Sequence, residues 1–444
     1  MRTENNKKVK RIITLSVLAL ITLFAKAQDY TQLAGKAFTQ NDVYTLRSLC
    51  ADHAAEIDPV LLAMSKPIVS LTFNRNEEAV KEFNELLTQH AEEIGLNNLL
   101  QMVYLACRNY EVMQEYGNAA DLCQQIISIV ESLEQVPNEM ADGFRSNRTR
   151  YLELAKHPAM TIDEHPDGLS IPFSIETFGP QNRSAQFAIQ GTLNGQAAKV
   201  VFDTGAGVNI ITPAYAERYG LKLIDTSTTI QGSGSIHARM AIAESLNMGD
   251  MQLHNVLFAV TDKNTGNDEA DKVAEATQII VGSAVLRLMQ EMTIDLQSNI
   301  MTVPAVAHEY DEPNITFSPN NFLLLARCMH NGEPIDMNID TGNTREWAHL
   351  DAGYYAAHKT ELDAITEVEE NRLAGLGGVT TETMTVLRDF TLSVGGKDCV
   401  LPKVLASKQA NDQSAIAKSA LGVKFFCQQN KVTLSVPYSK IMLE

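Results

Sequence analysis

Two aspartates of this chain stand in the same short sequence context, each two residues before a glycine. Asp203-Thr204-Gly205-Ala206 follows a run of apolar residues, and Asp340-Thr341-Gly342-Asn343 follows a second such run later in the chain. The turn-forming pairs Asn194-Gly195 and Asn331-Gly332 lie at the same distance before the two aspartates, so a hairpin turn, a strand and an acid recur in register. A single aspartate at a strand end is typical of a turn cap, whereas a registered pair indicates two acids that act together.

Two neighbouring carboxylates support a specific chemistry. They cannot both ionise at low cost, because repulsion between like charges raises one pKa and leaves the other low. At mildly acidic pH the pair shares one proton. The ionised carboxylate can take a proton from a bound water, which attacks a peptide carbonyl, while the protonated carboxyl donates to the carbonyl oxygen. The pattern predicts that Asp203 and Asp340 are catalytic, with the two roles left open because the titration belongs to the pair.

The residues around the aspartates resemble the active-site loops of pepsin-like and retropepsin-like aspartic proteases, over about residues 180–444. The resemblance implies that two lobes of one design each donate one aspartate, and that the threonines hydrogen-bond across the lobe interface. It implies that six residues support the dyad, namely Thr204, Gly205, Ala206, Thr341, Gly342 and Asn343. Asn343 departs from the family, in which Ser, Thr or Ala is usual, and its amide could hydrogen-bond Asp340 and alter the pKa values of the pair.

Each aspartate is followed by a glycine-rich turn between two strand-like segments. The first turn is Gly232-Ser233-Gly234, and the second contains Gly375, Gly377 and Gly378. The resemblance implies that these turns are flaps, hairpins that fold over a bound substrate, and glycine suits a loop that bends close to a ligand. Two ordinary glycine-bearing hairpin turns are an equally good interpretation. Neither turn carries the tyrosine usual in pepsin-like flaps, so the pattern is closer to the retropepsin one.

The segments around the aspartates repeat in one order, which indicates an internal duplication. In each copy a hairpin leads to the acid, a short helix follows, and an apolar-apolar-glycine element comes before a closing hairpin. These elements are Ile280-Val281-Gly282 and Ala420-Leu421-Gly422, which by resemblance to the family buttress the acid loops. We expect an all-β, bilobal aspartic protease fold of two retropepsin-like barrels, with an N-terminal lobe at 180–305 and a C-terminal lobe at 306–444.

Residues 28–160 predict an α-helical domain. Helix starts led by asparagine at positions 41, 76 and 118 recur near the period of helical-hairpin repeats, although the sequence signature of tetratricopeptide (TPR) units is missing. We expect a TPR-like α-helical hairpin domain, followed by a linker at 161–179 that carries proline, glycine and acids. Three roles are open for this domain: a surface for a protein partner, a packing or chaperoning domain, and a removable propeptide.

The first residues have the pattern of a secretory signal peptide. Several basic residues precede the apolar run from Ile12 to Phe24, and Ala25-Lys26-Ala27 forms a small-x-small cleavage site. The apolar run is too short to span a bilayer as a stable anchor. We therefore expect residues 1–27 to be removed and the protein to be exported, to the periplasm or outside the cell, with no membrane span in what remains.

Composition narrows the classes of partner. The formal net charge of −18 at pH 7 disfavours nucleic acid and anionic membrane surfaces. The six cysteines include no CxxC pair, and buried free thiols are the favoured interpretation for most, with disulfides as the alternative in an exported protein. Histidine spacing indicates no metal site, and no phosphate-binding loop accompanies the acids, so we expect no metal and no cofactor.

The sequence therefore predicts an aspartic endopeptidase that hydrolyses a peptide or protein substrate. The alternative is a catalytically inactive protease fold that holds peptides, while the helical domain recruits a protein partner. Asn343 favours the alternative, and the complete pair of aspartates opposes it.

Overall fold

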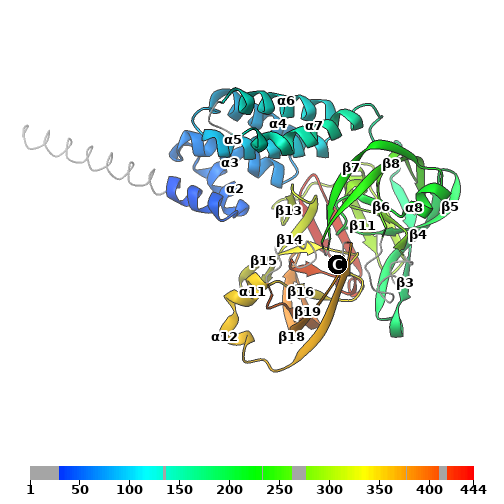
Figure 1. Cartoon of the computed structure of the whole chain (residues 1–444). Coiled ribbons are helices and arrows are strands. Elements are labelled where there is room, and N and C mark those ends of the chain that lie inside the picture. The colour runs from blue at the N-terminus through cyan, green and yellow to red at the C-terminus, as the bar shows by residue number, and fades with distance from the viewer. Residues whose placement is uncertain (1–29, 134–136, 233, 263–276, 377, 410–417) are drawn as a thin grey trace, which may run out of the picture. The chain divides into compact units, whose positions relative to one another are not determined.

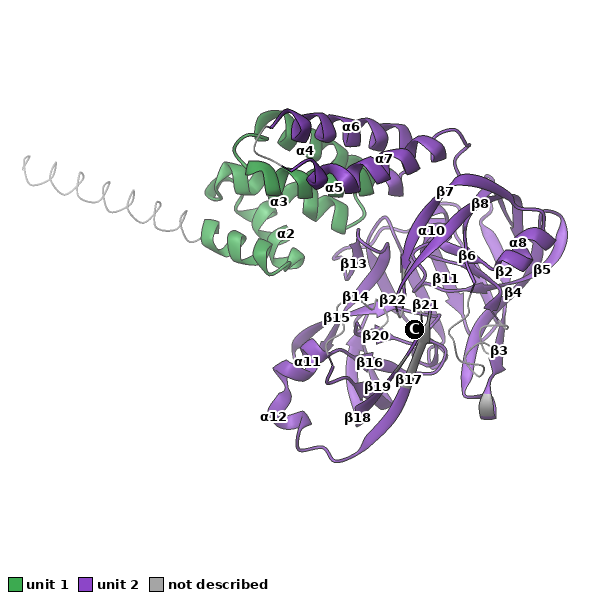
Figure 2. Cartoon of the chain, viewed as in Figure 1, with its two compact units in different colours: residues 1–110 green, residues 111–444 purple. Residues whose placement is uncertain are grey.

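The computed structural model describes residues 30–133, 137–232, 234–262, 277–376, 378–409 and 418–444. The expected signal peptide at 1–27 lies outside these residues. The chain divides into two compact units, residues 1–110 and 111–444, which Figure 2 distinguishes by colour. Helices form the described part of the first unit, and strands dominate the second (Figure 1). Within the described ranges, no helix combines the length and hydrophobicity needed to cross a membrane.

The first unit is built from capped helices. Residues 30–39 are helical, and α2 (Val43–Asp52), α3 (Pro59–Thr72), α4 (Asn76–Gln89) and most of α5 (Gly95–Val112) follow. Asp42 caps α2 and Asp58 caps α3, each through a carboxylate oxygen that accepts backbone N–H groups of the first turn. Leu46, Val69 and Phe73 are buried together in the core. The predicted helical region is confirmed, and α2 and α4 begin within two residues of the expected starts at positions 41 and 76.

Two further helices, α6 (Tyr116–Ser132) and α7 (Asp142–Leu154), belong to the second unit. Arg150 forms an ion pair with Glu111 at 2.6 Å, and the Tyr151 hydroxyl donates to the same carboxylate at 2.8 Å. The Gln114 side chain donates to Met160 O at 2.9 Å and accepts from Met160 N at 2.7 Å. The compact units divide after residue 110, whereas the helices continue to Leu154, close to residue 160, where we expected the helical domain to end.

Residues 161–179, which we expected to form a linker, contain three strands of the β region. β1 (Thr161–Ile162) pairs with β9 (Met251–Val260), β2 (Leu169–Pro172) with β12 (Ile300–Val303), and β3 (Ser174–Phe178) with β4 (Ser184–Leu193). The expectation rested on the proline, glycine and acids of this segment. Ile171 and Phe173 are buried and alternate with exposed neighbours, and this period of two is the signal of a strand.

The first sheet contains nine strands of the described residues. Their order is β1-β9-β6-β10-β5-β4-β8-β7, with β3 beside β4. The remaining bounds are β5 (Gln196–Phe202), β6 (Asn209–Ile211), β7 (Lys222–Gln231), β8 (Ser235–Met248) and β10 (Ile279–Val281). The short helix α8 (Pro213–Arg218) follows β6, and α10 (Ser283–Met289) follows β10.

The second sheet contains eight strands of the described residues, in the order β13-β14-β15-β20-β16-β19-β18-β17. Its strands are β13 (Ile315–Ser318), β14 (Leu323–His330), β15 (Glu333–Ile339), β16 (Ala348–Leu350), β17 (Val368–Gly375), β18 (Gly378–Val394), β19 (Lys397–Ala406) and β20 (Ala420–Leu421). The helices α11 (Ala352–Ala357) and α12 (Lys359–Leu362) follow β16, and α13 (Val423–Phe426) follows β20.

The two sheets repeat the same pairings around the aspartates. β10 runs parallel to β5 and antiparallel to β6, and β20 runs parallel to β15 and antiparallel to β16. The hairpins that lead to the acids turn at Asn194-Gly195 and Asn331-Gly332, where all four residues have positive φ. Both predicted hairpins are therefore confirmed, and the repeated order agrees with an internal duplication.

A third sheet connects the ends of both copies. Its order is β2-β12-β11-β21-β22, with β11 (Glu291–Asp295), β21 (Lys431–Ser435) and β22 (Lys440–Leu443). β11 from the first copy pairs antiparallel with β21 from the second over five residue pairs. Because backbone bonds join the two copies here, this sheet holds the two acid-bearing halves in one compact unit. Elsewhere, Cys107, Cys123, Cys328 and Cys399 are buried and form no disulfide among the described residues, which agrees with the favoured interpretation of the cysteines.

Candidate active site

Two buried threonines join the loops that carry the aspartates. The backbone N–H of Thr204 donates to Thr341 Oγ1, and that of Thr341 donates to Thr204 Oγ1, at 3.0 Å in both cases. Thr204 Oγ1 donates to Ile339 O at 2.7 Å, and Thr341 Oγ1 donates to Phe202 O at 2.9 Å. Each hydroxyl thus accepts one bond and donates one across the two loops. The reciprocal set fixes the position of one aspartate relative to the other.

Equivalent backbone bonds hold the two aspartates at the ends of their strands. The N–H of Asp203, which follows β5, donates to Val281 O of β10 at 2.9 Å. The N–H of Asp340, which follows β15, donates to Leu421 O of β20 at 3.0 Å. In both copies the apolar-apolar-glycine element therefore lies directly beside the acid loop, in the place that the family resemblance implied for it.

Each carboxylate lies against the glycine of the opposite loop. A Cβ atom on Gly205 would lie 2.2 Å from Asp340 Oδ1, and one on Gly342 would lie 2.2 Å from the carboxyl carbon of Asp203. Only a glycine leaves room for so close an approach. Asp203 Oδ1 also accepts from Gly205 N at 2.9 Å. The structure therefore brings the side chains of Asp203 and Asp340 to one place from loops that are far apart in the sequence.

The surroundings favour a proton on this pair. Burial, followed by the negative charge of Asp203, raises the pKa of Asp340 from its ordinary value to about 8. The backbone N–H groups of Asn343 and Gly342 act in the opposite direction, because they stabilise the ionised carboxylate. Since the two acids interact directly, this proton belongs to the pair as a whole.

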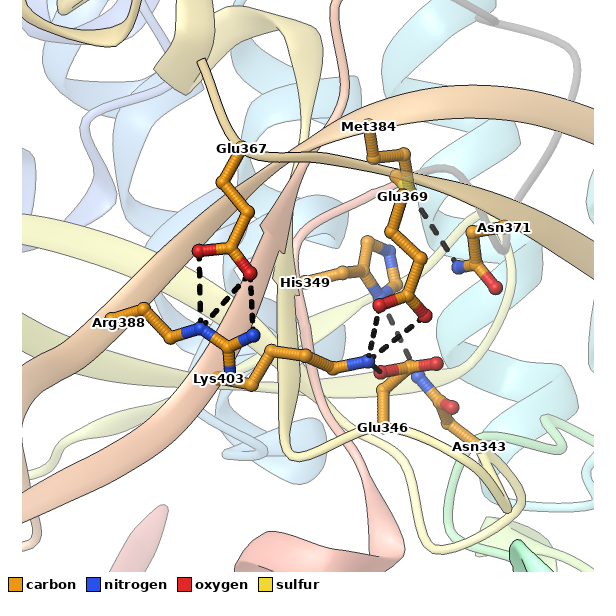
Figure 3. A network of polar contacts seen from close by, with 9 residues as sticks. All are labelled: Asn343, Glu346, His349, Glu367, Glu369, Asn371, Met384, Arg388 and Lys403. Carbon is orange, nitrogen blue, oxygen red and sulfur yellow. Dashed lines mark hydrogen bonds and ion pairs between the residues drawn. The ribbon is translucent and has the colours of Figure 1, made fainter. Parts of the chain in front are cut away.

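Asn343 acts on Asp340 through its backbone and not through its side chain. Its N–H donates to Asp340 Oδ1 at 2.9 Å. The side-chain nitrogen of Asn343 instead lies 3.4 Å from Nδ1 of His349, as Figure 3 shows. Any residue except proline could supply this backbone bond. The sequence suggested a contact between the side-chain amide of Asn343 and Asp340, but the structure shows a backbone contact that does not depend on the side chain.

Asn209 braces the first acid loop, and sequence reasoning missed it. Its Oδ1 accepts from Gly282 N at 3.0 Å, and its Nδ2 donates to Leu257 O at 3.0 Å. In the second copy, Gly422 N donates to the backbone oxygen of Trp347 at 2.9 Å. A buried asparagine that opens an apolar strand was the available signal, because such a side chain needs partners.

The two glycine-rich turns meet at the ends of their hairpins. Gly232 N donates to Gly234 O at 2.8 Å, and Gly234 N donates to Leu376 O at 3.3 Å. In the other hairpin, Gly375 and Gly378 are cross-strand partners. Ser233 and Gly377, which belong to the predicted flap residues, lie outside the described residues. Leu376 lies within the second predicted turn, and its carbonyl makes the contact between the two turns.

Comparison with known proteins agrees with this geometry over part of the chain. Residues 189–283 match the family model for aspartyl proteases. This stretch includes the loop of Asp203 and ends before that of Asp340. Among curated proteins, no significant match is found. Residues 189–283 thus resemble an aspartic protease domain, and the match supports a hydrolase of the protease type that acts on a peptide or protein.

Proposed function

We propose that the protein is an aspartic endopeptidase in which Asp203 and Asp340 activate one water molecule. The observation that carries this proposal is the reciprocal placement of the acids, each against the glycine of the other loop. The four bonds of Thr204 and Thr341 hold that placement. The family match over residues 189–283 supports the same class of reaction.

In the proposed reaction the pair shares one proton, and the reaction begins from the form in which Asp340 carries it, because burial and the charge of Asp203 raise the pKa of Asp340 to about 8. Asp203 accepts a proton from water as the water oxygen bonds to the peptide carbonyl carbon. The proton of Asp340 passes to the carbonyl oxygen, which gives a neutral tetrahedral diol. Transfer of a proton from Asp203 to the amide nitrogen then accompanies cleavage of the C–N bond, and a diol hydroxyl returns its proton to Asp340 as the new carboxylic acid forms.

The finer architecture is part of this proposal. The two sheets correspond to two retropepsin-like lobes, and the hairpins β7–β8 and β17–β18 to two flaps over the substrate. Their shared strand order supports this assignment. The helices of residues 30–154 are proposed to be TPR-like and to present a surface for a protein partner, and residues 1–27 to direct export to the periplasm or out of the cell.

Cleavage of an unfolded protein mixture between pH 3 and pH 7 tests the proposed activity. We expect wild-type protein to cleave the mixture and a statine-type inhibitor to block cleavage. Asp203→Asn and Asp340→Asn should each lower the rate by at least about 10²–10⁴-fold, because each removes one proton-transfer group. Asp389→Asn is the matched control, since Asp389 is exposed and lies on β18 away from the dyad.

Either of two results would overturn the proposal. The first is full activity in one of the two dyad variants, which would show that the acids do not act as a pair. The second is an absence of cleavage by folded wild-type protein at every pH tested, with the fold verified by circular dichroism.

A further inference from the structure

The repeated strand order lets residues of the first sheet be matched to residues of the second. Ile280 pairs with Val201, two positions before Asp203. Ala420 pairs with Asn338, two positions before Asp340. On its other side, Ile280 pairs with Ile210, and Ala420 pairs with His349. Ile210 and His349 therefore hold equivalent places beside the two acid loops.

The same matching extends into the two hairpins. β6 pairs with β9 in the first sheet, and β16 pairs with β19 in the second, so β9 and β19 are equivalent strands. β9 then pairs with β8, and β19 with β18, which makes the hairpin strands β8 and β18 equivalent in the same register. The equivalent residues found in this way are Ile210 and His349, Met240 and Val386, Ile236 and Glu382, and Ile230 and Asn371.

The side chains at these equivalent positions differ in polarity between the two sheets. The first sheet has isoleucine at each of the three places where the second has His349, Asn371 and Glu382, and Ala206 stands where the second has Asn343. His349, Asn371 and Glu382 are only 2%, 3% and 6% exposed. Buried polar groups cost free energy unless they find partners. Replacement of apolar residues by buried polar ones at these matched positions therefore indicates a role beyond packing.

Glu382 is a buried carboxylate that no cation balances among the described residues. Its Oε1 accepts from the Ser407 hydroxyl at 2.6 Å and from the backbone N–H groups of Lys408 and Gln409 at 2.9 and 3.1 Å. Its Oε2 accepts from the same Ser407 hydroxyl at 2.7 Å. Dipoles hold this carboxylate in one orientation, but its charge has no ionic partner in the part of the chain that is described.

The neighbouring acids differ from Glu382 in this respect. Lys403 Nζ lies 3.0 Å from both carboxylate oxygens of Glu369 and 3.7 Å from Glu346, and Arg388 forms an ion pair with Glu367 (Figure 3). Lys403 and Arg388 are thus already engaged with other acids.

Asn371, the cross-strand partner of Glu382, also has spare hydrogen-bonding capacity. The contact of its side-chain nitrogen is the thioether sulfur of Met384 at 3.5 Å, which is a weak acceptor (Figure 3). An amide as deeply buried as this one ordinarily bonds to stronger partners. Asn371 and Glu382 therefore form adjacent polar groups in the hairpin β17–β18, on the same face of the sheet.

We propose that Asn371 and Glu382 form a subsite for a cationic side chain of the substrate, lysine or arginine, whereas Ile230 and Ile236 form an apolar subsite in the first sheet. This inference rests on the proposed function. In the proposed complex, a peptide between the acid loops and the two hairpins would lie beside β7–β8 and β17–β18, which carry these residue pairs. A lysine or arginine beside Glu382 supplies the missing counter-ion and donates hydrogen bonds to the free capacity of the pair.

Peptide pairs that differ in one residue test the subsite. Lysine is compared with norleucine, its neutral counterpart, at each of three positions on both sides of the cleaved bond. We expect kcat/KM to be at least about tenfold higher for lysine at one position, because a hydrogen-bonded charge pair stabilises the bound substrate by enough free energy for a tenfold effect. In Glu382→Gln that ratio should fall close to one.

Two further variants make the comparison specific. The double variant Asn371→Ile with Glu382→Ile copies the first sheet and should reverse the preference toward norleucine, so it tests the subsite even if Glu382→Gln folds poorly. Glu370→Gln removes an exposed charge from the same hairpin, next to Asn371, and should leave the ratio unchanged. Thermal melting verifies that each variant is folded.

The outcomes separate this inference from the proposed function. Equal cleavage of lysine and norleucine peptides by wild type, or a lysine preference unchanged in Glu382→Gln, overturns the subsite and leaves the protease intact. If wild type cleaves no peptide, the proposed activity fails, and calorimetric binding of statine peptides that carry lysine or norleucine decides the subsite. Tighter lysine binding that is lost in Glu382→Gln supports it, and equal affinities overturn it.

Discussion

In the first sheet the N–H of Gly282 donates to the side chain of Asn209, whereas in the second the N–H of Gly422 donates to the backbone of Trp347. The bonds that hold the aspartates themselves do not differ in this way. In both sheets a backbone carbonyl of the adjacent strand receives the N–H of the aspartate, and a threonine hydroxyl crosses to the other loop.

This difference shows which parts of the site the duplication restricts. Groups that set the distance between the carboxylates are the same in both copies, because a change in one loop would displace the acid of the other. Groups one step further from the dyad are free to change as long as the same backbone N–H is satisfied. His349, Asn371 and Glu382 lie in this second class, at positions where the first sheet has isoleucines.

The largest effect that we expect on stability comes from the titration of the dyad. Because the pKa of Asp340 is raised in the folded state to about 8, the folded protein binds a proton that the unfolded chain releases above about pH 4. The stability from this proton is fully present below the unfolded pKa and is lost as pH rises toward 8. Urea unfolding from pH 4 to pH 8 should therefore show Asp340→Asn gaining stability relative to wild type as pH increases.

Asp203→Asn should change the pH dependence in the same direction, because it removes the charge that contributes to the raised pKa of Asp340. Asp389→Asn, with its exposed carboxylate, should follow wild type at every pH. A difference between Asp340→Asn and wild type that is constant from pH 4 to pH 8 would contradict the raised pKa.

The threonines provide the next test, and here the two copies should behave alike. Thr204→Val and Thr341→Val each remove a buried hydroxyl and leave one N–H and one carbonyl without their partner. We expect each variant to lose about 2–4 kcal/mol of unfolding free energy, measured by urea denaturation. Thr→Ser at the same positions keeps the hydroxyl and should lose less.

The double variant sharpens the comparison between the loops. Because both hydroxyls belong to one reciprocal set, removing both should cost less than the sum of the single losses. Losses that add within error, or a large loss at only one of Thr204 and Thr341, would mean that the two loops are not joined as a symmetric pair.

The sequence alone was enough to predict the parts of the fold that depend on local signals. The Asn-Gly turns have backbone angles that few other residues adopt, and the helix starts expected at positions 41 and 76 lie within two residues of α2 and α4. The repeat of turn, strand and acid then predicted that Asp203 and Asp340 share one site, and the structure brings their side chains together.

Features that depend on distant partners could not be predicted in the same way. β1 and β2 are short strands whose partners lie far along the chain, so composition alone gave the wrong expectation of a linker. The brace from Asn209 and the polar pair of Asn371 and Glu382 likewise become visible only when the strand registers are known. Long-range pairing, and not local propensity, decides each of these cases.

The smallest effect that we expect tests the brace that distinguishes the two sheets. Asn209→Ala removes the acceptor of Gly282 N and the donor to Leu257 O, both in a buried setting. We expect a loss of about 1–3 kcal/mol in unfolding free energy, measured by urea denaturation at pH 5. The dyad should then be less firmly held, so kcat for a good substrate should fall while KM changes little.

Asn343→Ala is the matched control for Asn209→Ala, because it removes an asparagine side chain from the other acid loop. The bond from Asn343 to Asp340 comes from the backbone, and the side chain makes only the 3.4 Å contact with His349. We therefore expect a loss below about 1 kcal/mol. Equal losses in the two variants would show that the two loops depend on their asparagines alike, and the contrast between a side-chain brace and a backbone brace would not hold.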